Sequence, residues 1–216
     1  MKARLRILLA AAALAAPFCG TPAAAQLSTG HSGHEGVRYM EDEELFSVIR
    51  TMGSCFAQRK QAQAAGFLAT APGSAPEGRA VRALLGNSTS CTPRGSRMSL
   101  PRDIIRGAVA EAMYLRTHPA PPAAEEKAAP ATAPSLADFT RCVVLRHPRE
   151  VHDLLATTRL GTREEHEAVV RLAPLLRACL PSSKQLEVVA PLLRLALADA
   201  LYDRARRLQS TQARVR

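Results

Sequence analysis

Two stretches decide the fold: IIRGAVAEAMYLR at residues 104–116 and LLRLALADALYDR at residues 192–204. When the first is shifted by 88 positions, six of thirteen residues are identical and five further pairs are conservative. Apolar residues and alanines recur in both at three- and four-residue steps, a pattern typical of a helix with a closely packed face. The chain therefore contains one helical phrase twice, which predicts a duplicated helical fold.

The repeat extends beyond this helix to the cysteines. Cys55 and Cys142 are 87 positions apart, and Cys91 and Cys179 are 88 apart. The segment FLATAPGS after the first cysteine corresponds to LLATTRLG in the second half. We infer two tandem copies of a small unit, and these copies span residues 41–116 and 135–208.

Each copy is predicted to be all-α, with about four short helices. Aromatic residues make up only 4% of the chain and tryptophan is absent, which favours packed helices over a β-sandwich. S/T-x-x-E motifs at Ser74 and Thr162 predict capping boxes, in which the hydroxyl accepts a bond from an amide three residues on and the glutamate reaches back. Pro174 is expected to kink or split the third helix of the second copy.

Residues 1–25 have the pattern of a secretory signal peptide. Three basic residues precede a short apolar run, and an A-x-A site predicts cleavage after Ala25. A lipid anchor at Cys19 is an alternative, although Phe18 before it is larger than such a processing site prefers. The mature protein is therefore expected to be exported to the periplasm, with no transmembrane segment once the leader is removed.

Three further segments lie outside the copies. Residues 26–40 are rich in Gly and Ser and are expected to be disordered. Residues 117–134 form a Pro/Ala linker, which does not fix how the two copies face each other. Residues 209–216 are a basic C-terminal tail.

The four cysteines of the mature chain are expected to form structural disulfides. Units this small bury little surface, and an oxidising compartment permits such bonds. Copies able to fold alone would each close their own bridge, which pairs Cys55 with Cys91 and Cys142 with Cys179. A zinc site built from all four thiolates is the alternative, but it prefers cysteine pairs two to four residues apart.

Six duplicated polar positions are the candidate site residues: Arg106, Glu111, Tyr114, Arg194, Asp199 and Tyr202. They could form two equivalent ligand or partner sites. They could also be an arginine–carboxylate contact and a tyrosine hydroxyl bonded at the edge of the core, which the fold needs in both copies.

From the remaining polar residues we assign no catalytic, cofactor-binding or metal-binding site. His152 and His166 flank a turn with Glu164 and Glu165, and a cluster there is one interpretation, with ordinary surface residues as the other. No hydrolase, phosphate-loop or zinc-protease motif is present. The sequence leans away from an enzyme and predicts no cofactor.

Charge narrows the class of partner. Removal of the leader lowers the net charge from +10 to +7, and arginines gather at the C-terminus. Outside the cytosol the available anions are lipid head groups, acidic polysaccharides and acidic proteins. We expect an unknown protein or an anionic envelope component as partner, and no nucleic acid.

The segments FLATAPGS and IIRGAVAEAMY, with Cys91 between them, resemble uncharacterised exported proteins of sphingomonad-type alphaproteobacteria with one or two such units. The resemblance implies an exported location and a repeat architecture, and it carries over no functional residue. Our first hypothesis is a non-catalytic interaction or envelope-associated module. The alternative is a small-ligand-binding periplasmic protein, with an enzyme ranked last.

Overall fold

The computed structural model describes residues 42–86, 91, 100–122, 135–180 and 188–215. Every regular element in these ranges is helical, which confirms the all-α class. The elements are α1 (Asp42–Arg59), α2 (Gln61–Leu68), α3 (Ala75–Leu85), α4 (Arg102–Thr117), α5 (Leu136–Arg146), α6 (Pro148–Thr157), α7 (Arg163–Leu176), a 3-10 turn (Arg177–Cys179) and α8 (Ala190–Val215). The predicted signal peptide, residues 26–40 and most of the linker lie outside the described residues.

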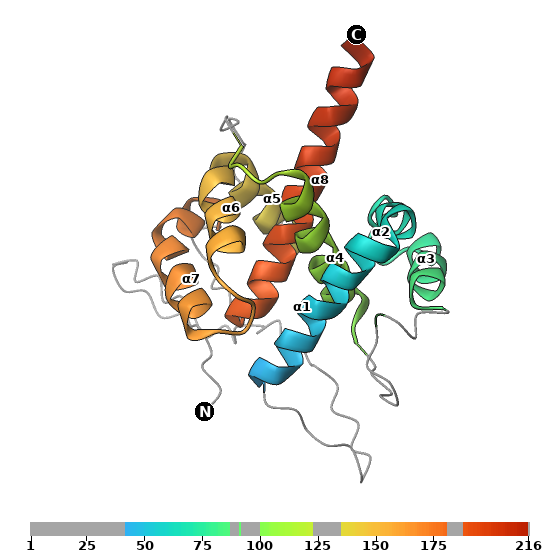
Figure 1. Cartoon of the computed structure of the whole chain (residues 1–216). Coiled ribbons are helices and arrows are strands. Elements are labelled where there is room, and N and C mark those ends of the chain that lie inside the picture. Colours follow the sequence, from blue (N-terminus) through green and yellow to red (C-terminus); the bar gives the residue numbers. More distant parts are fainter. Residues whose placement is uncertain (1–41, 87–90, 92–99, 123–134, 181–187, 216) are drawn as a thin grey trace, which may run out of the picture.

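Helices α4 and α8, which hold the two opening phrases, form the centre of the molecule. Their mutual contact is the most extensive between any two elements of the described chain. Helices α1 and α2 pack on α4, whereas α5, α6 and α7 pack on α8. Figure 1 shows α1–α3 on one side of this central pair and α5–α7 on the other. Each of the predicted phrases is therefore the innermost helix of its half.

The two central helices approach each other until their backbones are nearly in contact. A Cβ atom built on Gly107 of α4 would lie 2.5 Å from the Cβ of Leu195 and 2.6 Å from its carbonyl oxygen on α8. No side chain fits in that space, so glycine is required on the α4 side of the crossing. Leu195 is the residue 88 positions after Gly107, so corresponding positions meet at the crossing.

The predicted helix starts at Ser74 and Thr162 are correct. The Ser74 hydroxyl accepts a hydrogen bond from the Glu77 amide at 3.2 Å, and the Thr162 hydroxyl accepts one from the Glu165 amide at 3.4 Å. Each bond satisfies one amide that the first turn of a helix leaves without a partner.

Each glutamate also reaches back as predicted, to the amide one residue before the capping residue. Glu77 accepts a bond from the Gly73 amide and Glu165 accepts one from the Gly161 amide, each at 2.8 Å, in place of the amide of the capping residue itself. Both glycines have positive φ angles, 76° and 83°, which few other residues adopt. This conformation turns their amides toward the start of the following helix.

Both predicted disulfides are confirmed. Cys55 is bonded to Cys91 and Cys142 to Cys179, with Cα atoms 5.5 and 5.7 Å apart. Each bridge joins the first helix of its half to the segment that follows the third. Because the four thiols are consumed in these bonds, the zinc alternative is wrong.

Two details of the second half concern Pro174 and the basic tail. Pro174 does not split α7, which continues to Leu176 and then passes into the 3-10 turn. The predicted basic tail is helical where the structure describes it, since α8 continues to Val215. Proline destabilises a helix interior because its ring removes one hydrogen-bond donor. Pro174 lies within the last turn of α7, where this loss interrupts the helix least.

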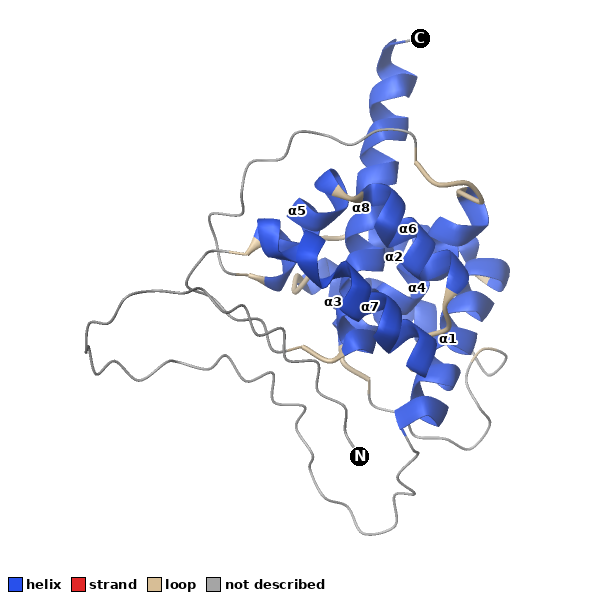
Figure 2. Ribbon diagram, turned by 90° about the vertical axis from the view of Figure 1, so that its left-hand side faces the viewer, coloured by secondary structure: helices blue, strands red, loops and turns tan. Residues whose placement is uncertain are grey.

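The C-terminal end of α8 extends beyond the rest of the molecule. Figures 1 and 2 show this end of the helix projecting past the other helices. All residues from 206 to 214 are exposed, and Leu208 is among them. None of the described helices combines the length and the apolar character that a membrane span requires.

Candidate functional site

Two buried arginines occupy the interface between the central helices. Arg106 of α4 is 6% exposed, and its Nε donates to the two carboxylate oxygens of Asp199 on α8 at 3.0 and 2.9 Å. Its Nη2 donates to the Leu68 carbonyl at 2.8 Å, and its Nη1 to Glu77 at 3.3 Å. The guanidinium thus ties α4 to α8 and to the end of α2.

Arg194 of α8 makes the corresponding contacts in the opposite direction. It is 1% exposed, and its Nε and Nη2 donate to the two carboxylate oxygens of Glu111 on α4 at 2.9 and 2.8 Å. Its remaining N–H groups donate to the carbonyls of Leu154 and Leu155 and to Thr158 at the end of α6. All five N–H groups of this guanidinium are therefore occupied.

The two ion pairs are reciprocal. Arg106 reaches the acid on α8, and Arg194, 88 positions later, reaches the acid on α4. Each duplicated arginine thus bonds the duplicated acid of the other half of the chain. Four of the six predicted site residues are brought together in this way, and they are bonded to one another.

Sequence reasoning missed a third member of each cluster, the glutamate that begins the third helix. Glu77 lies 3.3 Å from Arg106 Nη1, and Glu165 lies 3.6 Å from Arg194 Nε. The S/T-x-x-E motif locates these glutamates but explains them fully as caps. Only their identical spacing to the following duplicated arginine hinted at a second role.

Glu165 is the most perturbed acid of the two clusters. It is fully buried, and its Oε1 accepts no hydrogen bond from the described residues. Burial raises the pKa of its carboxyl group from 4.5 to about 7, and the charge of Glu111 adds to that effect. The Gly161 amide and Arg194 oppose the shift. This glutamate therefore changes its charge near neutral pH.

The acid of the other pair is less enclosed. The Asp199 side chain is 26% exposed, whereas that of Glu111 is 7% exposed. Burial raises the pKa of Asp199, and Arg106 opposes the shift through its charge and its hydrogen bonds.

The two predicted tyrosines lie where the halves meet. Tyr114 of α4 is 1% exposed and belongs to the apolar core formed by α5–α8, whereas Tyr202 of α8 packs against both this core and the core formed by α1–α4. The Tyr114 hydroxyl lies 3.2 Å from Nδ1 of His152, and the His118 ring stacks on the tyrosine at 4.9 Å. Burial raises the pKa of Tyr114 to about 12, so the phenol stays protonated.

The histidine cluster considered near Glu164 is not formed around His152. His152 is buried, and its ring bonds Tyr114. Burial lowers the pKa of His152, which favours the neutral imidazole. Among the residues that the structure describes, no three His, Cys, Asp or Glu side chains are grouped to hold a metal ion.

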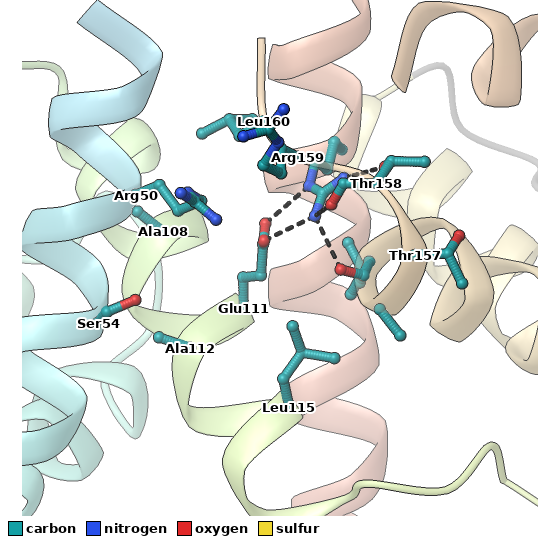
Figure 3. A pocket seen from close by; sticks show the side chains of 13 residues that line it. Arg50, Ser54, Ala108, Glu111, Ala112, Leu115, Thr157, Thr158, Arg159 and Leu160 are labelled. Carbon is teal, nitrogen blue, oxygen red and sulfur yellow. Dashed lines mark hydrogen bonds and ion pairs between the residues drawn. The ribbon is translucent and has the colours of Figure 1, made fainter. Parts of the chain in front are cut away.

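An open cleft of about 250 Å³ lies above the Glu111–Arg194 pair. Its walls come from α1, α4, the end of α6 with the following loop, and α8 (Figure 3). Polar groups dominate its lining, and the exposed side chains of Arg50 and Arg159 are among them. We call this space the Glu111 cleft, and it is lined by Arg50, Ser54, Ala108, Glu111, Ala112, Leu115, Leu155, Ala156, Thr157, Thr158, Arg159, Leu160 and Arg194.

Comparison of the chain with protein-family models, with curated proteins and with solved structures found no significant match. Function is therefore inferred from the residues of this chain alone. They place the duplicated arginines and acids in internal contacts, and among the exposed arginines some lie around the Glu111 cleft and others along the free end of α8.

Proposed function

We propose that this protein is a non-catalytic interaction module of the exported compartment, which binds an anionic partner through the projecting end of α8. The single observation that carries the proposal is the exposed, acid-free helix surface of residues 206–214, which bears Arg206, Arg207 and Arg214. Gln209 contacts His118 at 3.4 Å, but no other side chain of this segment forms a hydrogen bond or ion pair outside α8 within the described chain, so its arginines are left to serve a partner.

The sign of the charge at the end of α8 determines which class of partner we propose. Asp203 pairs with Arg206 at 3.2 Å and with Arg207 at 2.8 Å, and it is the last acid of the chain. The end of the helix therefore keeps a net positive charge. Opposite charge speeds encounter with an acidic surface and sets specificity more than it sets affinity. Exposed Leu208 adds apolar area beside the arginines.

A non-catalytic role is supported by the use of the chain's reactive groups. The four described cysteines are in disulfides, so they have no thiolate to attack a substrate. Arg194 and Glu111 are bonded to each other, and the Tyr114 hydroxyl lies against buried His152. Export is our proposal as well, with a signal peptide at 1–25 cleaved after Ala25, and it is supported by the disulfides, which persist in oxidising compartments such as the periplasm.

We also propose that residues 41–116 and 135–208 are tandem copies related by an approximate two-fold axis near Gly107 and Leu195. Support comes from the reciprocal ion pairs, because a two-fold interface pairs residue i with j and residue j with i. Tyr114 and Tyr202 add to this support, because each contacts the core of the other half.

The interaction proposal is tested by capture from periplasmic extract. The test variant is R206S/R207S/R214S, and the matched control is R79S/R82S/R171S, which removes the same charge from exposed positions on α3 and α7. We expect the wild-type chain and the control to retain an anionic partner that the test variant loses, with binding that weakens as salt rises. Equal recovery by both variants, or recovery of nothing by the wild-type chain, would contradict the proposal.

A further inference from the structure

The Glu111 cleft has the chemistry of a binding site for a small anion. We propose that it binds a small oxyanion, the phosphate or carboxylate group of a compact solute, between Arg50 and Arg159, with a preference for an oxyanion that also carries a hydroxyl group. This site is separate from the projecting end of α8.

The arginines around the cleft differ in what they already bond. Arg194 is saturated, because its five N–H groups are donated to Glu111, to Thr158 and to the end of α6. Arg50 and Arg159, by contrast, donate no side-chain hydrogen bond and form no ion pair within the part of the chain that the structure describes. Two guanidinium groups thus face the cleft with their donors free, and a guanidinium binds carboxylate and phosphate through paired N–H bonds.

Arg50 and Arg159 lie on separate walls of the cleft. Arg50 extends from α1 toward the end of the Glu111 side chain, and Arg159 lies above Glu111 in the same view (Figure 3). Ser54 is one helical turn after Arg50, so its hydroxyl is on the same face of α1 and also lines the cleft. An anion between the two walls would be bonded from both sides.

The charge of the cleft favours an anion. Three arginines line it, and Glu111 is the one acid among the lining residues. The nearby Glu165 has a pKa of about 7 and is therefore only partly ionised at neutral pH. A net positive charge remains, and a bound anion relieves the repulsion between the arginines.

These arginines are not part of the scaffold that the two halves have in common. At the matching offsets the first half has Pro72 in place of Arg159, and the second half has Ala137 in place of Arg50. The Arg–acid pair beneath is present in both halves, at Arg106 with Asp199 and at Arg194 with Glu111. The buried arginine–acid pair therefore occurs in both halves. Arg50 and Arg159, whose donors are free within the described chain, lie next to the Arg194–Glu111 pair alone.

The volume of the cleft and the Glu111 carboxylate beneath it restrict which ligand can bind. A space of about 250 Å³ holds on the order of eight water molecules, so only a small solute fits. Each oxygen of Glu111 accepts a bond from Arg194 and has a second lone pair available. A hydroxyl on the ligand can donate to that lone pair, whereas a fully deprotonated oxyanion is repelled. Hydrogen phosphate and hydroxy acids meet this condition, and sulfate does not.

Titration calorimetry of the full chain at low salt tests the site, with inorganic phosphate, sulfate, malate and succinate as probes. We expect phosphate to bind more tightly than sulfate if the ligand is a phosphate compound, and malate more tightly than succinate if it is a carboxylate. R50A and R159A should each weaken the tighter probe about tenfold, and R50K should weaken it less than R50A. R79A on α3 serves as the control and should leave binding unchanged.

All three positions are exposed, so the variants should keep the unfolding temperature of the wild-type protein, which is measured alongside. Binding of no probe by the wild-type chain would overturn the site. So would equal affinity in the wild type and in R50A/R159A. Binding of sulfate as tight as phosphate, together with succinate as tight as malate, would overturn the role of Glu111.

Discussion

Gly107 and Leu195 meet where α4 and α8 cross, and a Cβ on the glycine would lie within 2.6 Å of the leucine's carbonyl oxygen. A close approach of α4 and α8 thus falls between two positions that are 88 residues apart in the chain. All the reciprocal contacts are arranged around this point, which makes the spacing of the two helices critical for stability.

Gly107→Ala should therefore destabilise the protein, because the added methyl group forces the central helices apart. We expect a loss of at least about 2 kcal/mol, typical of overpacking in a dense core. Gly66→Ala is the matched control, since a Cβ at this exposed helical position meets no atom within 4 Å. That change should stabilise α2 by about 0.5–1 kcal/mol. Urea denaturation of both variants checks the prediction, and a neutral Gly107→Ala would show that the helices can separate freely.

Glu111→Gln should cost about 3 kcal/mol, because it leaves the buried Arg194 charge without its bidentate partner. Replacement of both residues in E111M/R194M should cost less than the sum of the single changes, because no uncompensated charge remains. The exposed pair Arg163–Glu167 provides the control, and Glu167→Gln should change stability by less than about 1 kcal/mol. Strict additivity in the double-variant cycle would argue against a coupled buried pair.

Glu165 should make the protein less stable as pH rises. Its pKa is about 7 in the folded protein and near 4.5 when exposed, so the folded state binds the proton more tightly. Stability from this group is fully present below pH 4.5 and is lost as pH rises through 7, by at most about 3 kcal/mol.

The measurement is denaturation of E165Q beside the wild type across this pH range. Glutamine mimics the protonated acid, so E165Q should gain on the wild type as pH rises. Both proteins contain His152, whose lowered pKa acts in the opposite direction, and its effect cancels in the difference. A constant difference between the two proteins across the range would refute the assignment to Glu165.

Loss of either disulfide should cost about 3–4 kcal/mol, since each bridge closes a loop of 36 or 37 residues. C55S/C91S and C142S/C179S are expected to have similar effects, and a reducing agent should produce both losses in the wild type. Thermal unfolding with and without reductant checks this. A wild-type transition that reductant does not move would show that the bridges contribute no stability.

Local features of this fold could be predicted from the sequence. Helix starts at Ser74, Ser135 and Thr162 follow from short-range chemistry, in which a hydroxyl bonds an amide three residues on. The disulfide pairing followed from a repeat of nearly constant spacing. Each of these features joins residues of the same half of the chain.

The relationship between the halves could not be predicted, because the linker allows many orientations. Arg106 and Glu111 were noted as a duplicated pair, yet each bonds the other half of the chain. The same reason hid the Glu111 cleft, whose walls are up to about 140 residues apart in the chain, from Arg50 to Arg194. Only the docked helices bring those residues together.

Each half depends on a tyrosine from the other. Tyr114 of the first half lies in the second core and Tyr202 of the second half packs on both cores, while each disulfide remains within its own half. A peptide-bond cut after Lys127 would therefore yield two fragments that stay associated without a covalent link. The nicked protein should unfold in a single cooperative transition. The contact between α4 and α8 would then hold the two halves together without a continuous polypeptide.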